Sequence, residues 1–274
     1  MHDVAVPRLA LVLGSGGVRS VAALGLVEVQ RREGIVPDLL VGCSAGAMVG
    51  ALVTFDYPEP EALRIATTLW TAEIARQRRW VAVPQMLWPR QGCFDADFAM
   101  RHDHLIRTRL AQAFGDTRLE QRRPALRVSA TDAATGAAVV VVKGPAVDAL
   151  RSSIAMPFTF APQQIGGQRL IDGFVSDPLP VSAAHDARAV LAFGFEAPLP
   201  SRVNGPSRLL AQVTSSMTTT SCMPASPRPN LPECNCCACL PGSTAHRPVR
   251  HRCHALPGNR AAEQQKLRCP RCPR

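Results

Sequence analysis

The stretch that best predicts the fold is residues 9–46, LALVLGSGGVRSVAALGLVEVQRREGIVPDLLVGCSAG. It opens with an entirely apolar run, Leu9–Leu13, which predicts a short buried strand. A glycine-rich loop, a helix at about Val21–Glu33 and a second short strand at Leu39–Gly42 follow. Another helix is predicted at Ala47–Val53. Strands that alternate with helices through tight connections predict a parallel sheet covered by helices, which is the α/β class.

The chain continues with mixed helices and strands up to about residue 220. Residues 58–114 are predicted to be mainly helical, with a break around Pro84–Gly92. The later predicted elements are strands at 125–129 and 138–143, a short helix at 147–154, a hairpin tip at Gly166-Gly167 before a strand at 169–171, a buried strand at 189–193 and an amphipathic helix at 207–220.

Residues 42–46, Gly42-Cys43-Ser44-Ala45-Gly46, match the G-x-S-x-G pattern of a nucleophile elbow. In such an elbow, a sharp strand-to-helix turn strains the serine, and the flanking glycines avoid side-chain collisions. The helix that follows directs its N-terminal N–H groups at the site. The pattern predicts Ser44 as a nucleophile, and the alternative is a tight turn with a surface serine.

The loop Gly14–Ser20 has three glycines between a strand and a helix, so its backbone N–H groups could hold an anion. A P-loop needs Gly-Lys-Ser/Thr before the helix, and this loop lacks it. A dinucleotide fingerprint needs glycine where Arg19 stands and an acidic residue at the end of the second strand, whereas Asp38 precedes that strand. The third interpretation is an oxyanion hole beside the elbow.

A nucleophile needs a base, and the sequence offers two kinds. His102, His104 and His185 could be placed in a triad, but no pattern marks them out. Asp172 ends an apolar strand and is followed by glycine, which also describes an ordinary Asp-Gly turn. The residues alone leave this choice open.

Three motifs in this order resemble the patatin-like phospholipase family: GSGGVRS at 14–20, GCSAG at 42–46 and LIDGF at 170–174. The segments VDALRSSIAMPFTFAP at 147–162 and DPLPV at 177–181 are also similar to the family. The resemblance covers about residues 8–220 and is nearest to the small bacterial branch. It implies a three-layer α/β/α fold with a mostly parallel central sheet, and a domain at residues 1–220.

The resemblance also implies the chemistry. By similarity, Ser44 attacks an acyl carbonyl and Asp172 accepts its proton, without a histidine. The N–H groups of Gly16 and Gly17 hold the oxyanion, and Arg19 anchors their loop. Because an ordinary aspartate is a weak base near neutral pH, we expect partial burial to raise the pKa of Asp172. Gly42 and Gly46 form the elbow.

The implied activity is hydrolysis of lipid carboxyl esters through an acyl-enzyme intermediate, with no cofactor and no metal. Phospholipid, lysophospholipid and simpler acyl esters all remain open as substrates, and the family permits transient contact with a membrane surface. Three alternatives stay: an α/β-hydrolase with Ser44, Asp172 and His185, an acyltransferase with a Ser–His pair, and a non-catalytic anion-binding module. The sequence says nothing about oligomeric state.

The motifs depart from the family pattern at three positions. Ser15 and Ser20 replace the usual first and last glycines of the loop, and Phe174 stands where a small residue is more usual. Ser20 would matter if its position required a positive φ. No departure removes a catalytic group.

Charge and cysteine are unevenly distributed. The formal net charge is +10, but nine of the 31 basic and two of the 21 acidic residues lie at 222–274, so residues 1–221 carry only +3. This balance argues against nucleic-acid binding.

Cysteine is also unevenly distributed, since only Cys43 and Cys93 precede residue 222. Isolated cysteines, with no signal peptide and no apolar run of membrane-spanning length, predict a cytoplasmic protein.

A helical stretch with several large apolar side chains lies at residues 58–114. Trp70, Trp80, Leu87 and Trp88 gather there, which fits a lid or a lipid-facing surface. We expect the plainer role, packing in the core.

Residues 221–274 form a tail rich in cysteine, proline and arginine, with nine prolines and eight cysteines at 222–274. A zinc site is one interpretation, but only Cys269-Pro270-Arg271-Cys272 has C-x-x-C spacing. We favour a disordered tail or a frameshifted translation of a GC-rich gene. In that case the domain would lack its last helices, and a protein with intact motifs could be inactive.

Overall fold

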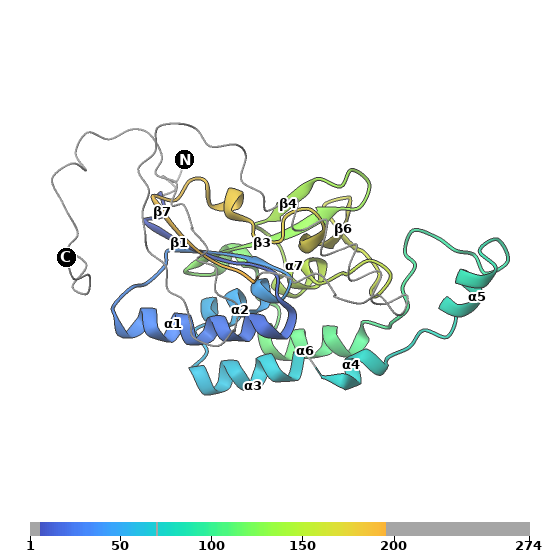
Figure 1. Ribbon diagram of the computed structural model, residues 1–274, viewed down its shortest axis with the longest axis horizontal. Helices are drawn as coiled ribbons and strands as arrows, with labels where there is room; N and C mark the ends of the chain where they lie inside the picture. Colours follow the sequence, from blue (N-terminus) through green and yellow to red (C-terminus); the bar gives the residue numbers. More distant parts are fainter. Residues whose placement is uncertain (1–5, 70, 196–274) are drawn as a thin grey trace, which may run out of the picture. The chain divides into compact units, whose positions relative to one another are not determined.

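The computed structural model describes residues 6–69 and 71–195. The helix predicted at 207–220, the domain boundary at residue 220, the tail at 221–274 and Trp70 lie outside the described residues. Figure 1 shows the arrangement of the elements. In chain order they are β1 (Leu9–Leu13), η1 (Gly17–Val21), α1 (Ala22–Arg32), β2 (Leu39–Cys43), α2 (Ala45–Thr54), α3 (Glu59–Leu69), α4 (Ala72–Arg76), α5 (Ala82–Leu87), α6 (His104–Phe114), η2 (Leu119–Gln121), β3 (Ala125–Asp132), β4 (Ala138–Val141), α7 (Ala146–Ser153), β5 (Gln163–Ile165), β6 (Gln168–Asp172), η3 (Gly173–Val175), η4 (Val181–Ala184) and β7 (Ala189–Phe193), where η marks a 3-10 helix.

The strands form one sheet in the order β5-β6-β3-β2-β1-β7, and β4 pairs with β3. Strands β1, β2, β3 and β7 are parallel, whereas β4 and β6 run antiparallel to β3, and β5 runs antiparallel to β6. Five of the seven strands therefore point in one direction. The expectation of a mostly parallel central sheet is confirmed.

Both faces of the central strands are covered. Successive residues of a strand point to opposite faces, and in β1 the side chains of Leu11 and Leu13 join the core beneath α1 and α2. Ala10 and Val12 join a smaller core with Ala183 of η4 on the other face. Figure 1 shows α1, α2, α3 and α6 on one side of the sheet. This arrangement is consistent with the three-layer α/β/α fold.

Helix α2 lies at the centre of the larger core. All ten of its residues are buried, which explains why its sequence is apolar on every side. The prediction of a helix here was correct, although it begins at Ala45, two residues earlier than expected. This early start places the helix N-terminus directly after Ser44.

The structure differs from expectation in the segment between α4 and α6. Helix α5 runs through Pro84, where a break was predicted. Pro84 occupies the first turn of this helix, where an N–H group has no partner within the helix and its loss costs nothing. The core role expected for Trp80, Leu87 and Trp88 is wrong, because these side chains are exposed.

Strand β7 has the predicted bounds but is not buried as predicted. Val190 and Leu191 are 38% and 40% exposed. Among the described residues β7 pairs only with β1, so it forms an edge of the sheet. An apolar run identifies a strand, but its place in the sheet depends on its neighbours.

Candidate active site

The register of the sheet brings Ser44 and Asp172 to the same level. Cys43 at the end of β2 pairs with Ser129 of β3, so the next residue, Ser44, lies level with Ala130. Ala130 in turn pairs with Asp172, the last residue of β6. Residues 128 positions apart in the chain therefore meet across a single strand.

Ser44 has the strained backbone expected of an elbow. Its φ is 54° and its ψ is −123°, a conformation that side-chain-bearing residues rarely adopt. A Cβ on Gly42 would collide with the backbone of Ala47, and one on Gly46 would collide with the carbonyl oxygens of Leu13 and Gly14. Glycine is required at both flanking positions because the first turn of α2 packs against β2 at Gly42 and against the end of β1 at Gly46.

The hydroxyl of Ser44 donates a hydrogen bond to Oδ2 of Asp172 at 3.0 Å. The other carboxylate oxygen, Oδ1, accepts the backbone N–H of Phe174 at 2.9 Å. The main chain of Asp172 is also held, since its N–H donates to the carbonyl of Ala155 at 3.0 Å and its carbonyl accepts from Thr131 Oγ1 at 2.9 Å. Both the position and the rotation of the carboxylate are therefore constrained.

Burial raises the pKa of the Asp172 carboxyl. Asp172 is only 2% exposed. The loss of hydration raises its pKa to about 7, against the opposing effects of the Phe174 N–H, the Ser44 hydroxyl and the charge of Arg151. Arg151 is itself completely buried and is paired with Asp103 at 3.1 Å. A pKa near 7 suits a general base at neutral pH.

Ser153, the last residue of α7, supports the elbow and was not predicted from the sequence. Its Oγ accepts the backbone N–H of Ser44 at 2.8 Å and donates to the carbonyl of Ser129 at 2.6 Å. The side chain therefore ties the elbow to β3. The available signal was a pair of serines, Ser152-Ser153, directly before the apolar residues Ile154 and Ala155.

The glycine loop lies against the elbow. Its first two N–H groups are used structurally, since Gly14 donates to Phe193 and Ser15 donates to Pro178, both at 2.8 Å. Among the described residues, the N–H groups of Gly16 and Gly17 have no acceptor. Gly17 has a φ of +56°, which glycine tolerates. The loop thus offers two backbone donors close to the start of α2.

Arg19 lies along the same loop rather than at the dyad. Its Nε donates to the carbonyl of Gly16 at 3.4 Å, and its guanidinium lies 5.1 Å from the ring centre of Phe195. These contacts agree with an anchoring role.

Ser20 replaces the usual last glycine of the loop without strain. It is buried and has no positive φ, and its hydroxyl contacts the Gly14 carbonyl at 3.5 Å.

The three histidines do not join the site. All are exposed, and the ring of His185 contacts the carbonyl of Ser182 at 3.0 Å. Among the described residues, none of them hydrogen-bonds to Ser44 or Asp172.

Cys43, next to Ser44, is buried, and burial raises the pKa of its thiol well above the usual value. It therefore stays protonated and unreactive.

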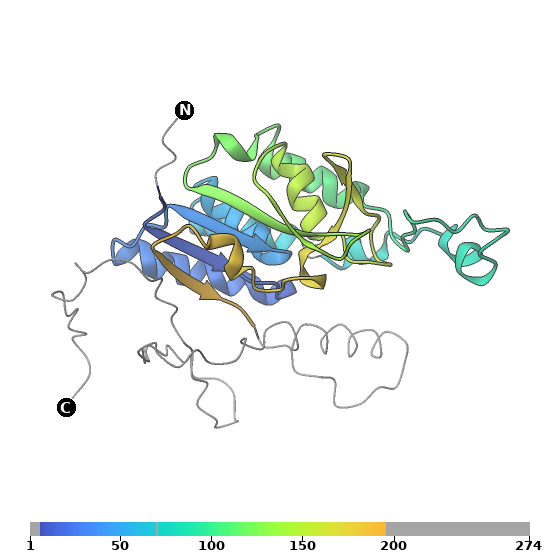
Figure 2. The same ribbon diagram turned by 90° about the horizontal axis from the view of Figure 1, so that it is seen from above.

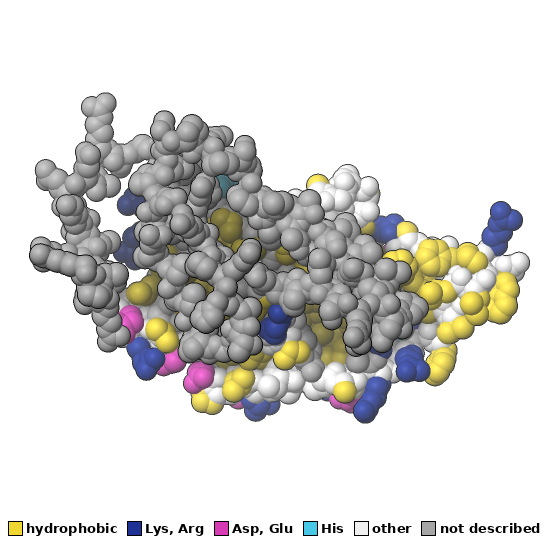
Figure 3. Space-filling view, in the orientation of Figure 1, with side chains coloured by type: hydrophobic (Ala, Val, Ile, Leu, Met, Phe, Trp, Pro, Cys, Tyr) yellow, Lys and Arg dark blue, Asp and Glu magenta, His cyan; other side chains and the backbone are white. Residues whose placement is uncertain are grey.

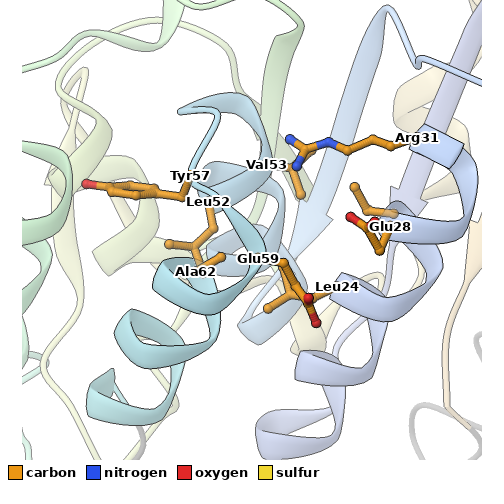
Figure 4. A pocket seen from close by; sticks show the side chains of 9 residues that line it. Leu24, Glu28, Arg31, Leu52, Val53, Tyr57, Glu59 and Ala62 are labelled. Atoms are coloured by element: carbon orange, nitrogen blue, oxygen red, sulfur yellow. The ribbon is translucent and has the colours of Figure 1, made fainter. Parts of the chain in front are cut away.

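A crevice in the helical layer lies apart from Ser44 and Asp172. The crevice in Figure 4 lies between α1, α2 and α3, lined by side chains such as Leu24 and Tyr57. It meets the C-terminal half of α2, away from Ser44 at the N-terminus of that helix.

Within 6–69 and 71–195, no group of three or more His, Cys, Asp or Glu side chains is placed to bind a metal. No helix in this part of the chain is both long and apolar enough to cross a membrane.

A family model described as patatin-like phospholipase matches residues 11–185. The chain belongs to the patatin-like phospholipase family. The matched residues include the loop, the elbow and Asp172 on their respective strands. The predicted family and fold are therefore confirmed.

Relatives of this patatin-like chain include proteins of the NTE family. An uncharacterized NTE family protein of Mycobacterium tuberculosis is 31% identical over 176 residues, covering 64% of this chain and 45% of that protein. Lysophospholipase NTE1 of Saccharomyces cerevisiae is 26% identical over 174 residues, covering 64% of this chain and 10% of that protein. The crystal structure of VipD from Legionella pneumophila superposes with a TM-score of 0.39 at 14% identity, covering 64% of this chain and 47% of that one. The chain spans about half the length of the bacterial relative.

Proposed function

We propose that this protein is a lipid acyl-ester hydrolase that uses Ser44 and Asp172 as a catalytic dyad. The observation that carries the proposal is the 3.0 Å hydrogen bond from the Ser44 hydroxyl to a buried carboxylate. A serine hydroxyl is a weak nucleophile until a base accepts its proton. A carboxylate with a pKa of about 7 can accept that proton at neutral pH.

In the acylation step, Ser44 Oγ attacks the acyl carbonyl carbon and its proton moves to Oδ2 of Asp172. The carbonyl oxygen becomes an oxyanion, which accepts hydrogen bonds from the N–H groups of Gly16 and Gly17. The tetrahedral intermediate collapses and the bond to the alcohol breaks. Asp172 returns its proton to the leaving oxygen, so the alcohol departs neutral and the acyl group stays on Ser44.

Deacylation repeats these steps with water. Asp172 accepts a proton from a water molecule whose oxygen attacks the acyl carbonyl. The second intermediate expels Ser44 Oγ, which recovers its proton from Asp172, and a carboxylic acid leaves. Both half-reactions need one base that alternates between two protonation states, and a carboxylate with a pKa near the ambient pH performs this role best.

The substrate class is a carboxyl ester of a lipid. The yeast relative is named a lysophospholipase, so a lysophospholipid is the first ester to test, ahead of diacyl phospholipids and short-chain esters. Arg19 would anchor the oxyanion loop through Gly16 and Phe195. The cytoplasmic location stays a prediction from the sequence.

The direct test is labelling of the full-length protein with a fluorophosphonate probe, followed by mass spectrometry of its peptides. We expect label on Ser44 in the wild type, none in Ser44→Ala, and strongly reduced labelling in Asp172→Asn. Ser182→Ala is the matched control, because Ser182 is exposed and hydrogen-bonds to a different carboxylate, Asp177. Circular dichroism of each variant reports whether it is folded.

Two outcomes would decide against this function. Absence of label on folded wild-type protein would contradict an assembled dyad. Label that persists in Asp172→Asn at the wild-type rate would contradict Asp172 as the base. The alternative of an anion-binding module on Gly14–Ser20 predicts phosphate binding that Ser44→Ala leaves unchanged, with no turnover of any ester.

A further inference from the structure

Residues 76–94, here called the α5 segment, expose an unusual amount of hydrophobic surface. Trp80 is 72% exposed, Leu87 61% and Trp88 57%. The other exposed large hydrophobic side chains of the segment are Val81, Val83, Met86 and Phe94. Figure 3 shows hydrophobic side chains gathered at this end of the described part. Contiguous apolar surface of this kind marks an interaction site.

The charges of the α5 segment all have the same sign. It contains Arg76, Arg78, Arg79 and Arg90 and no acidic residue. Among the described residues, none of these four arginines has an ion-pair partner. The nearest acidic residue after the segment, Asp95, forms no ion pair with these arginines. The segment therefore presents tryptophans and aliphatic side chains next to four arginines that no described carboxylate pairs with.

The α5 segment lies on the catalytic side of the sheet. In Figure 2 the arrows of β1, β2 and β3 point toward the side on which α5 lies, and Ser44 follows the end of β2. Six residues after the segment ends, the N–H of Met100 donates to the carbonyl of Phe158 at 2.8 Å. Phe158 is three residues beyond Ala155, which accepts the backbone N–H of Asp172. The surface and the dyad thus share a supporting loop.

We propose that the α5 segment docks the protein onto an anionic phospholipid surface. Tryptophan and leucine side chains insert at the level of the headgroups, and the arginines bind lipid phosphates and other anionic headgroup oxygens. The charge pattern favours this occupant over a second copy of the chain, because two such segments facing each other would repel. Docking deepens the proposed function, since it would bring the dyad to its lipid substrate.

The test is co-sedimentation of the full-length protein with vesicles of phosphatidylcholine alone or of phosphatidylcholine mixed with phosphatidylglycerol. We expect preferential binding to the mixed vesicles. The double variant Trp80→Ser/Trp88→Ser should weaken this binding about tenfold. In the triple variant Arg76→Gln/Arg78→Gln/Arg90→Gln, the loss of each arginine should weaken the binding by a further factor of about five. Val36→Ser is the matched control, because Val36 is 67% exposed and lies outside the segment.

Basic residues at 222–274 are the same in every variant, so differences between variants report on the α5 segment alone. If all variants bind equally, the tail or general charge is responsible and the docking proposal is wrong. If the wild type sediments as a dimer and Trp80→Ser/Trp88→Ser sediments as a monomer, the surface serves self-association instead.

A second measurement keeps both Trp80 and Trp88 in place and so guards against misfolding of the variants that replace them. In Trp70→Phe, the remaining tryptophans are Trp80 and Trp88, and brominated lipids in the mixed vesicles should quench their fluorescence. Unquenched fluorescence of bound protein would overturn the proposal.

The docking surface and the dyad can fail separately. Ser44→Ala should bind vesicles like the wild type, and Trp80→Ser/Trp88→Ser should hydrolyse a soluble short-chain ester at the wild-type rate. Vesicle binding by a wild type that hydrolyses nothing would support docking and contradict the proposed hydrolase function.

Discussion

Ser153 Oγ accepts the backbone N–H of Ser44 at 2.8 Å while donating to the Ser129 carbonyl at 2.6 Å. One hydroxyl thereby joins the end of α7 to both the elbow and the neighbouring strand. Ser44 holds a positive φ that costs about 1–3 kcal/mol and persists only where the surroundings impose it. The Ser153 hydroxyl is one of the groups that hold Ser44 in this backbone conformation.

Replacing Ser153 with alanine should therefore affect both stability and turnover. The Ser44 N–H and the Ser129 carbonyl would lose a partner, at a cost of about 1–3 kcal/mol in the free energy of unfolding. We expect kcat to fall about tenfold with KM nearly unchanged, because the nucleophile is displaced and binding is not. Ser152→Ala is the control, since among the described residues the Ser152 hydroxyl donates only to Ala149 of its own helix. Equal kinetics for the two variants would contradict the positioning role.

The pH dependence of hydrolysis should follow the ionisation of Asp172. Its carboxyl must be deprotonated to act as a base, and burial raises its pKa to about 7. We expect kcat/KM for a soluble ester to rise about tenfold per pH unit up to about pH 7 and then to level off. An ordinary aspartate would level off below pH 5. A profile that is flat between pH 5 and pH 8 would count against Asp172 as the base.

Asp172→Asn should abolish turnover and yet stabilise the fold at high pH. The folded-state pKa is raised from 3.8 to about 7, so this group favours folding below pH 4 and loses that contribution as pH rises through 7. A difference of about three pH units corresponds to about 4 kcal/mol at most. We expect denaturation by urea to show a variant that is more stable than the wild type at pH 8, with the difference shrinking toward pH 4.

Asp132→Asn provides a control of opposite sign. Hydrogen bonds from the backbone N–H groups of Thr135 and Ala134 lower the pKa of Asp132. Its ionised form therefore stabilises the folded state at neutral pH, so the asparagine variant should be less stable than the wild type at pH 8. If both asparagine variants change the free energy of unfolding at pH 8 in the same direction, Asp172 is not a carboxyl with a raised pKa.

Gly46→Ala should disrupt the elbow. The added Cβ would overlap the carbonyl oxygens of Leu13 and Gly14, which are backbone atoms that cannot move independently of the sheet. We expect a loss of about 3 kcal/mol in thermal or urea unfolding, with slower turnover because the oxyanion loop is displaced. Gly50→Ala in the same helix is the control, since the three nearest atoms to its Cβ belong to side chains, of which the closest is a Leu126 methyl group at 3.2 Å. Similar losses for both would show that the helix, not the elbow contact, is responsible.

Much of the site followed from local sequence. Leu9–Leu13 has the predicted bounds, and the elbow and the Asp-Gly turn lie where their motifs indicated. These features are local, because a strained serine needs small residues on both sides and a buried parallel strand needs an unbroken apolar run. The amino-acid sequence by itself was enough to identify the α/β class, the family and the two residues of the candidate dyad.

Tertiary structure alone decided the rest. The motifs named Asp172, but the register across β3 is what brings it, and none of the three histidines, next to Ser44. The contact of Ser153 with the elbow depends on how α7 packs and could not be predicted from the sequence. The pKa of Asp172 and the exposure of Trp80 depend on which segments cover them. Burial is a property of the packed chain and not of a residue type, so patterns in the sequence could name these side chains but could not say which of them would face water.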